Sequence, residues 1–330
     1  MQLASDLRPW RLHDFYWGAS GDGLILVLSQ AGSDKRVLAW LDLRARSVAP
    51  LTPDLDGDAR YVSQTAGSKP QVLIAVRQSP AAASRLVAVT PTGALISEWD
   101  PPAGHATRWL ATGTQAVAVC TDSGRCTWWH TKLDQPSWSP IAAIPAADGQ
   151  ASRPVAFSSD GQTLFALSSA DRDTVALIKM SAAEWSPEVV YERERFDVTA
   201  VLMAPDGTGP ELVTTTDAGA RQSALTSDGA ADLATLAEIA GGARATITGS
   251  NGSTCLAEVS FQWVGRRLSR SVAVGEQSSV QAPSGAGARS AARQLAASPW
   301  PGSPVWPGSE CSRVRRSATG PGMACSSPAT

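Results

Sequence analysis

Six apolar or β-branched stretches recur along the chain at steps of 43 to 48 residues. They are Leu24–Gln30, Val72–Arg77, Val117–Thr121, Leu164–Ser168, Leu212–Thr216 and Cys255–Phe261. A repeat of that length built from short strands is typical of a β-propeller, in which each repeat supplies one four-stranded blade. The sequence therefore predicts an all-β fold of five to six four-stranded antiparallel blades. Because the repeats stop at about Phe261, we expect the propeller to be incomplete.

The second and fourth repeats show the expected strands most clearly, because turn residues separate them. In the second repeat the strands are expected at Tyr61–Thr65, Gln71–Arg77, Arg85–Val89 and Ala94–Trp99. In the fourth repeat they are expected at Val155–Ser158, Thr163–Ser168, Thr174–Met180 and Glu188–Tyr191. Asp160-Gly161 turns the first hairpin of the fourth repeat, since glycine readily adopts the positive φ that tight hairpins require. Equivalent turn residues stand in the fifth and first repeats, at Pro205-Asp206-Gly207 and Gly21-Asp22-Gly23.

One segment has helical periodicity instead. Apolar residues three positions apart predict a helix over Ala230–Ala240, in an outer connection between strands. Asp228 is placed to cap its start and Gly241-Gly242 to end it.

The composition changes after the last repeat. Ser, Ala, Gly and Pro make up 39 of the 69 residues from 262 to 330, and this segment has arginine without lysine. Such a segment buries too little apolar surface to offset its ordering entropy, so it is expected to be disordered. It is either an ordinary disordered tail or the translation of a GC-rich gene out of frame, and the break inside a blade favours the second. We expect a lead-in at 1–14, blades at 15–261 and the tail at 262–330.

Charge and hydropathy limit the classes of partner. Residues 1–261 carry 20 basic and 28 acidic side chains, so the body lacks the basic footprint of a nucleic-acid-binding protein. No apolar run approaches the roughly 20 residues that span a bilayer. Met1–Trp10 does not resemble a signal peptide. A cytoplasmic location is therefore expected, with the five cysteines reduced.

One cluster has residue types that bind metals. Cys120 and Cys126 flank a predicted turn and His130 follows, so the two sulfur atoms could lie close together. Zinc requires four ligands, and no second ligand pair is apparent. Buried reduced thiols are the preferred interpretation, and no metal or cofactor is predicted.

Other conspicuous residues have structural interpretations. Trp128 and Trp129 alternate across a strand, so one is expected between blades and the other outward or in the channel. The acidic run Asp54–Asp58 lacks the distal glutamate of an EF-hand loop and is interpreted as a solvated turn. Glu192–Arg195 is interpreted as a solvated face with local ion pairs.

A serine-hydrolase triad cannot be assembled from these residues. The segment most like a Gly-x-Ser-x-Gly elbow is Gly18–Asp22, which has aspartate in place of the second glycine and leads into a hairpin. Histidines occur only at His13, His105 and His130, whereas the hydrolase order is serine, acid, then histidine. The sequence therefore predicts no catalytic residue.

Two segments nevertheless resemble a known family. Phe15–Pro53, with its aromatic strand, turn and Leu-Thr-Pro ending, resembles a blade of prolyl oligopeptidase-family serine peptidases of the acylaminoacyl-peptidase-like branch. Ser152–Met180 is similar to a later blade of the same proteins. In that family the propeller covers a C-terminal α/β-hydrolase domain that carries the triad and acts on peptide substrates.

Two functions follow as hypotheses. The first is a non-catalytic remnant of such a peptidase, cut at both ends, whose propeller would otherwise restrict access to the hydrolase site. Finding an elbow sequence in another frame of the downstream DNA would support it. The alternative is an independent propeller that binds a protein or peptide. A WD-repeat protein is disfavoured, because Trp99-Asp100 is the only such dipeptide.

Overall fold

The structure is a computed structural model. It describes residues 10–275, apart from gaps at 20, 53–56, 66–68, 80–81, 103–104, 123, 218, 241–243, 251–253 and 264–265.

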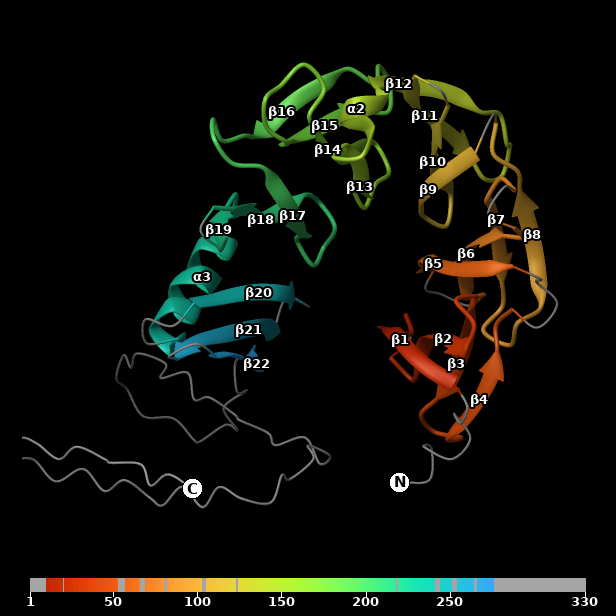
Figure 1. The fold of residues 1–330 in the computed structure, drawn as a ribbon, viewed down its shortest axis with the longest axis horizontal. Coiled ribbons are helices and arrows are strands. Elements are labelled where there is room, and N and C mark those ends of the chain that lie inside the picture. Colours follow the sequence, from red (N-terminus) through yellow and green to blue (C-terminus); the bar gives the residue numbers. More distant parts are fainter. Residues whose placement is uncertain are drawn as a thin grey trace, which may run out of the picture. The chain divides into compact units, whose positions relative to one another are not determined.

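The described chain forms six antiparallel sheets, each built from strands that are consecutive in the sequence (Figure 1). The first sheet contains β1 (Trp10–Trp17), β2 (Gly23–Gln30), β3 (Arg36–Asp42) and β4 (Ser47–Pro50). The second contains β5 (Asp58–Thr65), β6 (Gln71–Arg77), β7 (Arg85–Val89) and β8 (Leu95–Trp99). The third contains β9 (His105–Ala111), β10 (Gln115–Thr121), β11 (Arg125–Lys132) and β12 (Ser139–Pro145).

The later sheets continue the same order. The fourth contains β13 (Arg153–Phe157), β14 (Thr163–Ser168), β15 (Ala176–Ser181) and β16 (Pro187–Tyr191), after a four-residue helix α2 (Ala146–Gly149). The fifth contains β17 (Val198–Met203), β18 (Pro210–Thr216) and β19 (Ala220–Ala224). The sixth contains β20 (Arg244–Ser250), β21 (Thr254–Trp263) and β22 (Arg266–Gly275). These sheets confirm the predicted all-β propeller with five to six blades.

All six repeated apolar stretches form the second strand of their sheets, as the repeat predicts. A second strand is paired on both sides, and in the inner sheets apolar clusters shared with the neighbouring sheets cover both of its faces. In β6, for example, every residue from Val72 to Val76 is buried. This double burial explains why these segments are continuous apolar runs without alternation.

Three of the first hairpins share one turn geometry. In the fourth sheet Ser158 N–H donates to the Thr163 carbonyl, and Gly161 N–H donates to the Ser158 carbonyl. The same two bonds recur at Gly18–Gly23 in the first sheet and at Ala204–Gly209 in the fifth. In each turn the residue three positions after the first is a glycine with φ of 71° to 73°, which confirms the predicted requirement for positive φ. In the first sheet that glycine is Gly21, which precedes Asp22, so the Asp22-Gly23 pair lies two residues later in its turn than the Asp-Gly pairs of the other two turns.

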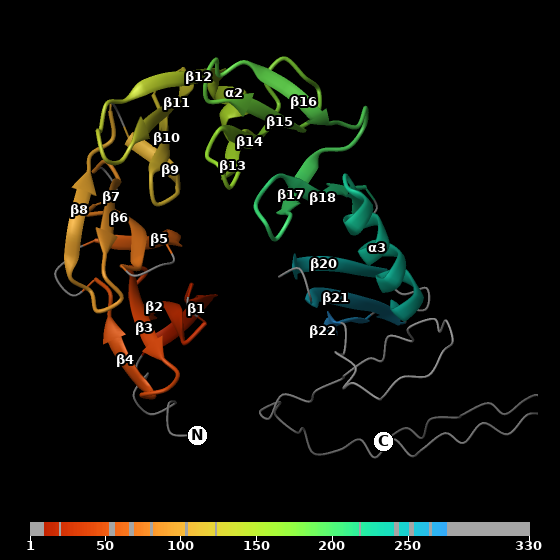
Figure 2. The same ribbon diagram turned by 180° about the vertical axis from the view of Figure 1, so that it is seen from behind.

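Helix α3 (Ser227–Ala240) stands where the fifth sheet would have a fourth strand. It contacts β19 and β20, and both ribbon views show it beside the fifth and sixth sheets (Figure 2). Its start differs from the prediction, because Thr226 is the capping residue and Asp228 lies in the first turn. The Thr226 hydroxyl accepts a hydrogen bond from Gly229 N–H at 3.1 Å. The expected end at Gly241-Gly242 lies outside the described residues.

Both predicted domain boundaries need correction. Strand β1 begins at Trp10, within the segment expected to be a lead-in. At the other end β21 continues to Trp263 and pairs along its full length with β22, so the sixth sheet extends to Gly275. The alternating apolar positions Leu268, Val272 and Val274 are compatible with a strand. The remaining tail, 276–330, lies outside the described residues.

The core consists of apolar layers between successive sheets. Ile25, Val27 and Leu38 of the first sheet pack against residues of the second. Equivalent clusters join the second sheet to the third, the third to the fourth, the fourth to the fifth, and the fifth to the sixth through α3. Packing between neighbouring sheets thus supplies the burial that no single sheet has alone.

The first sheet also has an apolar second face. Leu26, Leu28, Ala39 and Leu41 form a buried cluster on it. Strand β1 has a β-bulge after Leu12, so its large apolar side chains on both sides of the bulge lie on this same face of the sheet. Four of them are exposed: Trp10, Leu12, Phe15 and Trp17. We call this set the β1 apolar face.

Neither α2 nor α3, the helices of the described residues, has the length and apolar character that crossing a bilayer requires.

Candidate functional site

A cavity of about 520 Å³ lies between the second, third and fourth sheets. Its walls come mainly from β5, β9 and β13, the first strands of those sheets, with contributions from β6 and from the segment before β7. A volume of this size is typical of sites that bind small molecules or short peptide segments. The cavity is therefore a candidate binding site.

Three arginines line this cavity from equivalent positions. In the strand pairing, Arg60 lies opposite Ala75, Arg108 opposite Val119 and Arg153 opposite Leu167. Each of these partners is the fifth residue of the second strand of its sheet. The intervals between the arginines are 48 and 45 residues, whereas the second strands of the same three sheets recur at steps of 45 and 47, so the equivalence of the arginines rests on strand pairing. Consecutive blades thus place the same side chain at the same height. We call Arg60, Arg108 and Arg153 the arginine row.

Backbone carbonyl groups fix two members of the arginine row. Arg108 donates from Nη2 to the Gln150 carbonyl at 3.1 Å, and from Nη1 to the Ser152 carbonyl at 3.5 Å. Arg153 donates from Nη2 to the Thr199 carbonyl at 2.6 Å. Each bond connects one sheet to the segment that begins the next, so these guanidinium groups also join neighbouring sheets.

The charge of the cavity is unbalanced. Asp58 Oδ2 lies 3.6 Å from Arg60 Nε and 3.7 Å from Arg77 Nη2, so one carboxylate serves two arginines. Within the described ranges, Arg108 and Arg153 form no ion pair with a carboxylate. Burial lowers the pKa of the Arg153 guanidinium, and the positive charge of Arg108 lowers it further. Four guanidinium groups against one carboxylate make this a site for anions.

Aromatic side chains complete the walls. Tyr61 stacks on Tyr16 with ring centroids 4.1 Å apart, and Trp109 lies 5.8 Å from Trp138. The Trp109 indole N–H donates to the Ser84 hydroxyl at 3.0 Å. Burial raises the pKa of Tyr61 to about 12, so its phenol stays protonated at neutral pH and can donate a hydrogen bond. The cavity therefore offers both cationic donors and apolar surface.

The sequence analysis did not single out the arginines of this cavity. Each arginine stands in a first strand, where a basic residue is ordinary. Their intervals of 48 and 45 residues differ from the steps of 45 and 47 between the second strands of the same sheets, so spacing does not reveal the arginine row. Their equivalence becomes apparent from the strand pairing.

The structure places Cys120 and Cys126, the two cysteines considered for metal binding, on opposite faces of the third sheet. Cys120 packs beside Ala106 and Ala118 on one face of the third sheet, whereas Cys126 packs beside Trp128 on the other. The expectation that their sulfur atoms could be close is wrong, because side chains on opposite faces of a sheet point away from each other and cannot bind the same metal ion. Both cysteines are buried and neither forms a disulfide, in agreement with the preferred interpretation of buried reduced thiols. His130 instead contacts Gln115 Oε1 at 2.9 Å, and its ring lies against that of Trp185 in a tilted arrangement with the centroids 4.7 Å apart.

The two adjacent tryptophans both face neighbouring sheets. Trp128 is fully buried between the third and fourth sheets, as expected for one of the pair. Trp129 packs on the opposite face near Cys120, so the expectation that it points outward or into the channel is wrong. Trp128 is therefore a core residue, whereas Trp129 is partly buried.

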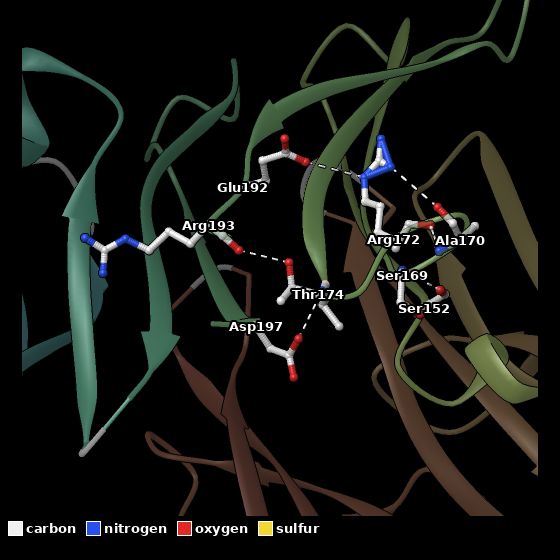
Figure 3. A network of polar contacts seen from close by, with 10 residues as sticks. Ser152, Ser169, Ala170, Arg172, Thr174, Glu192, Arg193 and Asp197 are labelled. Carbon is white, nitrogen blue, oxygen red and sulfur yellow. Dashed lines mark hydrogen bonds and ion pairs between the residues drawn. The ribbon is translucent and has the colours of Figure 1, made fainter. Parts of the chain in front are cut away.

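The charged runs also differ from their predicted roles. Asp58 is the first residue of β5 and forms ion pairs in the cavity, so it is not part of a solvated turn; Asp54 to Asp56 lie outside the described residues. Glu192 pairs with Arg172 at 3.6 Å across two connections of the fourth sheet, so its ion pair is not local (Figure 3).

The same view shows how the fourth sheet is joined to the fifth. Thr174 donates to the Arg193 carbonyl at 2.9 Å, and Asp197 accepts a hydrogen bond from Val175 N–H at 2.8 Å (Figure 3). The Arg193 side chain extends away from these contacts. The network holds the chain between β16 and β17 in place.

No triad geometry appears among the described residues. Gly18–Gly23 forms a hairpin turn, and Ser20 lies outside the described residues. His13 contacts the Ser29 hydroxyl at 2.7 Å on the first sheet, far along the chain from His130 on the third.

Comparisons with known proteins support the fold. No family model matches the sequence, and no curated protein matches it. The structure is similar to one of two prolyl endopeptidases analysed for inter-domain dynamics, with a TM-score of 0.53 and 8% identity over 81% of this chain. This chain covers only 43% of that enzyme. It is also similar to the β-propeller domain of the Trilobed protease from Pyrococcus furiosus, with a TM-score of 0.50 and 10% identity over 78% of this chain and 83% of that domain. These similarities establish the fold as a β-propeller of the kind found in prolyl endopeptidases.

Proposed function

We propose that this chain is a non-catalytic propeller that binds peptides and selects substrates for a serine peptidase of the prolyl oligopeptidase type. The observation that carries the proposal is the cavity on the first strands of three consecutive sheets, lined by the arginine row and by aromatic side chains. Charged donors beside apolar surface can hold both the polar and the apolar parts of a peptide.

The similarity to propellers of peptidases supports the peptidase context. The matching prolyl endopeptidase was analysed for the role of inter-domain dynamics in catalysis and specificity, so in that enzyme the relation between domains bears on substrate choice. The acylaminoacyl-peptidase-like branch, a hydrolase partner domain and a cytoplasmic location are further parts of this proposal.

Hydrolysis by the purified chain is the direct test. Aminoacyl and peptidyl chromogenic substrates are expected to show no turnover, because the described residues bring no nucleophile, base and acid together in one place. Turnover that a serine-directed inhibitor abolishes would show that the chain is itself a peptidase.

The alternative of an independent binding module uses the same cavity but needs no peptidase. Affinity capture with the full chain distinguishes the two. Specific recovery of a serine hydrolase supports the proposal, and recovery of other partners only would favour the alternative.

A further inference from the structure

We infer that the cavity between β5, β9 and β13 binds the carboxylate group of an acidic peptide, with Arg108 and Arg153 as the principal donors. This inference deepens the proposed function and rests on it for the ligand being a peptide. The shared chemistry is a carboxylate, which a peptide carries on Asp or Glu side chains and at its C-terminus.

The first argument is unused hydrogen-bonding capacity. A guanidinium has five N–H donors. Arg108 uses two N–H groups on the carbonyls of Gln150 and Ser152, and Arg153 uses one on Thr199. Most donors of both side chains have no partner within the described residues, and both line the cavity. A carboxylate accepts such donors in pairs, which is the strongest arrangement for this group.

The second argument is preorganisation. The backbone bonds of Arg108 and Arg153 hold these long side chains before a ligand arrives. Ordering a long, flexible side chain on binding normally lowers the affinity, because the side chain loses conformational entropy. Here the fold has already met most of that cost, so a bound carboxylate retains more of its interaction energy.

The third argument is electrostatic contrast. Arg108 lowers the pKa of Arg153, which shows that the two positive charges repel each other without a compensating carboxylate. Residues 1–261 as a whole carry eight more acidic than basic side chains. A locally positive cavity in an acidic protein attracts an anion to this one place and disfavours its binding elsewhere.

The fourth argument concerns the rest of the ligand. Tyr61, Trp109 and Pro154 supply apolar and aromatic walls next to the arginine row. An apolar residue beside the carboxylate would bury surface there. The expected ligand is thus a peptide in which an acidic group neighbours an apolar side chain.

Binding of short labelled peptides to the full chain tests the inference, with fluorescence anisotropy as the readout. Three N-terminally labelled peptides separate the sources: one with two Glu and a Leu and an amidated C-terminus, one with Gln for Glu and a free C-terminus, and one with Gln for Glu and an amidated C-terminus. Binding of the first peptide would identify a side-chain carboxylate as the bound group, and binding of the second would identify the C-terminal carboxylate. We expect at least one of the two to bind, and the third, which has no carboxylate, to bind at least tenfold more weakly. The affinity should fall with added salt.

Variants connect the binding to the cavity. Arg108→Gln and Arg153→Gln should each reduce the affinity about tenfold, because each removes charge-assisted hydrogen bonds. Arg60→Gln should reduce it less, since its side chain is 54% exposed and shares Asp58 with Arg77. The matched control is Arg125→Gln, which removes one exposed charge from β11 of the third sheet, outside the cavity, and should change the affinity less than twofold.

Loss of a backbone bond could unfold Arg108→Gln or Arg153→Gln, so thermal melting accompanies each measurement. Within the described residues the Arg60 side chain forms no hydrogen bond to a backbone carbonyl. Arg60→Gln should therefore fold normally, and its affinity still tests the site. Equal affinity of all four variants, or no difference between the three peptides, would overturn the carboxylate site.

A small carboxylate, N-acetylglutamate amide, separates this inference from the proposed function. If it binds in an arginine-dependent way and no peptide does, the anion site stands and the peptide-binding function fails. If an acidic peptide binds and no variant of the arginine row weakens it, the peptide-binding function stands and the site is wrong.

Discussion

Two threonines are buried to the same degree but differ in their hydrogen bonds. Thr215 on β18 has no exposed surface, and its hydroxyl has no partner within the described chain. Thr131 on β11 is 1% exposed, and its hydroxyl accepts from Ser137 N–H at 2.9 Å and donates to the Lys132 carbonyl. The pair isolates the contribution of a satisfied hydroxyl group.

We expect Thr215→Val to leave the free energy of unfolding unchanged or to raise it by up to about 1 kcal/mol, because valine has the same shape and no unsatisfied polar atom. Thr131→Val should lower it by about 1–3 kcal/mol, because Ser137 N–H loses its acceptor. Urea denaturation of the two variants measures both. Equal losses would mean that Thr215 has a partner after all.

The surroundings of His130 predict how the stability of the folded chain depends on pH. Burial lowers the pKa of its imidazole, and the charge of Lys132 lowers it further. The unfolded chain therefore takes up a proton near pH 6.5 before the folded chain does, so the folded state loses stability as the pH falls below 6.5. In His130→Gln the midpoint of thermal unfolding should fall less between pH 7 and pH 5. His13→Gln on β1 is the control, and a change as large as that of His130→Gln would contradict the assignment.

At the scale of the element, helix α3 depends on one capping hydroxyl. Thr226→Ala removes the acceptor for Gly229 N–H and should cost about 1 kcal/mol of stability. Thr226→Ser keeps the oxygen and should retain most of that energy. Circular dichroism during denaturation measures both variants, and an identical loss in the two would exclude a capping role.

The elements also show which features the sequence could predict. The second strands were predictable because burial on both faces leaves an unbroken apolar run in each repeat, as at Val72–Val76. The turn at Gly161 was predictable because a positive φ restricts the choice of residue. The cap at Thr226 was not, because Asp228 is an equally suitable residue two positions later and only the path of the backbone decides between them.

The cavity was harder to predict for a different reason. Its residues lie far apart in the chain, and Arg60, Arg108 and Arg153 meet only because three sheets pack in order. The second role of Arg108 and Arg153, bonding to carbonyl groups of the segments that begin the following sheets, leaves no trace in composition or hydropathy. The separation of Cys120 from Cys126 likewise depends on strand register, which a turn between them does not fix.

At the scale of the whole molecule, the β1 apolar face predicts self-association. Trp17 is 58% exposed and Phe15 50%, on an edge strand beside an apolar cluster. Exposed edges and apolar patches of this kind favour association between copies. We therefore expect the ring to be open and the full chain to form concentration-dependent oligomers or aggregates in size-exclusion chromatography.

Replacing Trp17 and Phe15 with serine should raise the monomer fraction. Leu95→Ser on β8 removes a side chain that is 55% exposed but lies outside the β1 apolar face, so it should not. A monodisperse monomer with cooperative melting in the unaltered chain would show that the propeller closes and would refute the expectation of a remnant.

The strict chain order of the sheets has a consequence for synthesis. Every sheet uses only consecutive strands, so each can pair as soon as about 45 residues have left the ribosome. Translation at about 5–20 residues per second gives each sheet several seconds, whereas a hairpin forms in about 1–10 μs. Each new sheet then covers the apolar face of the sheet before it, while its own far face waits for the next. The nascent chain therefore carries one uncovered apolar face that moves forward with translation, and a chaperone that holds this face would act on every blade in turn.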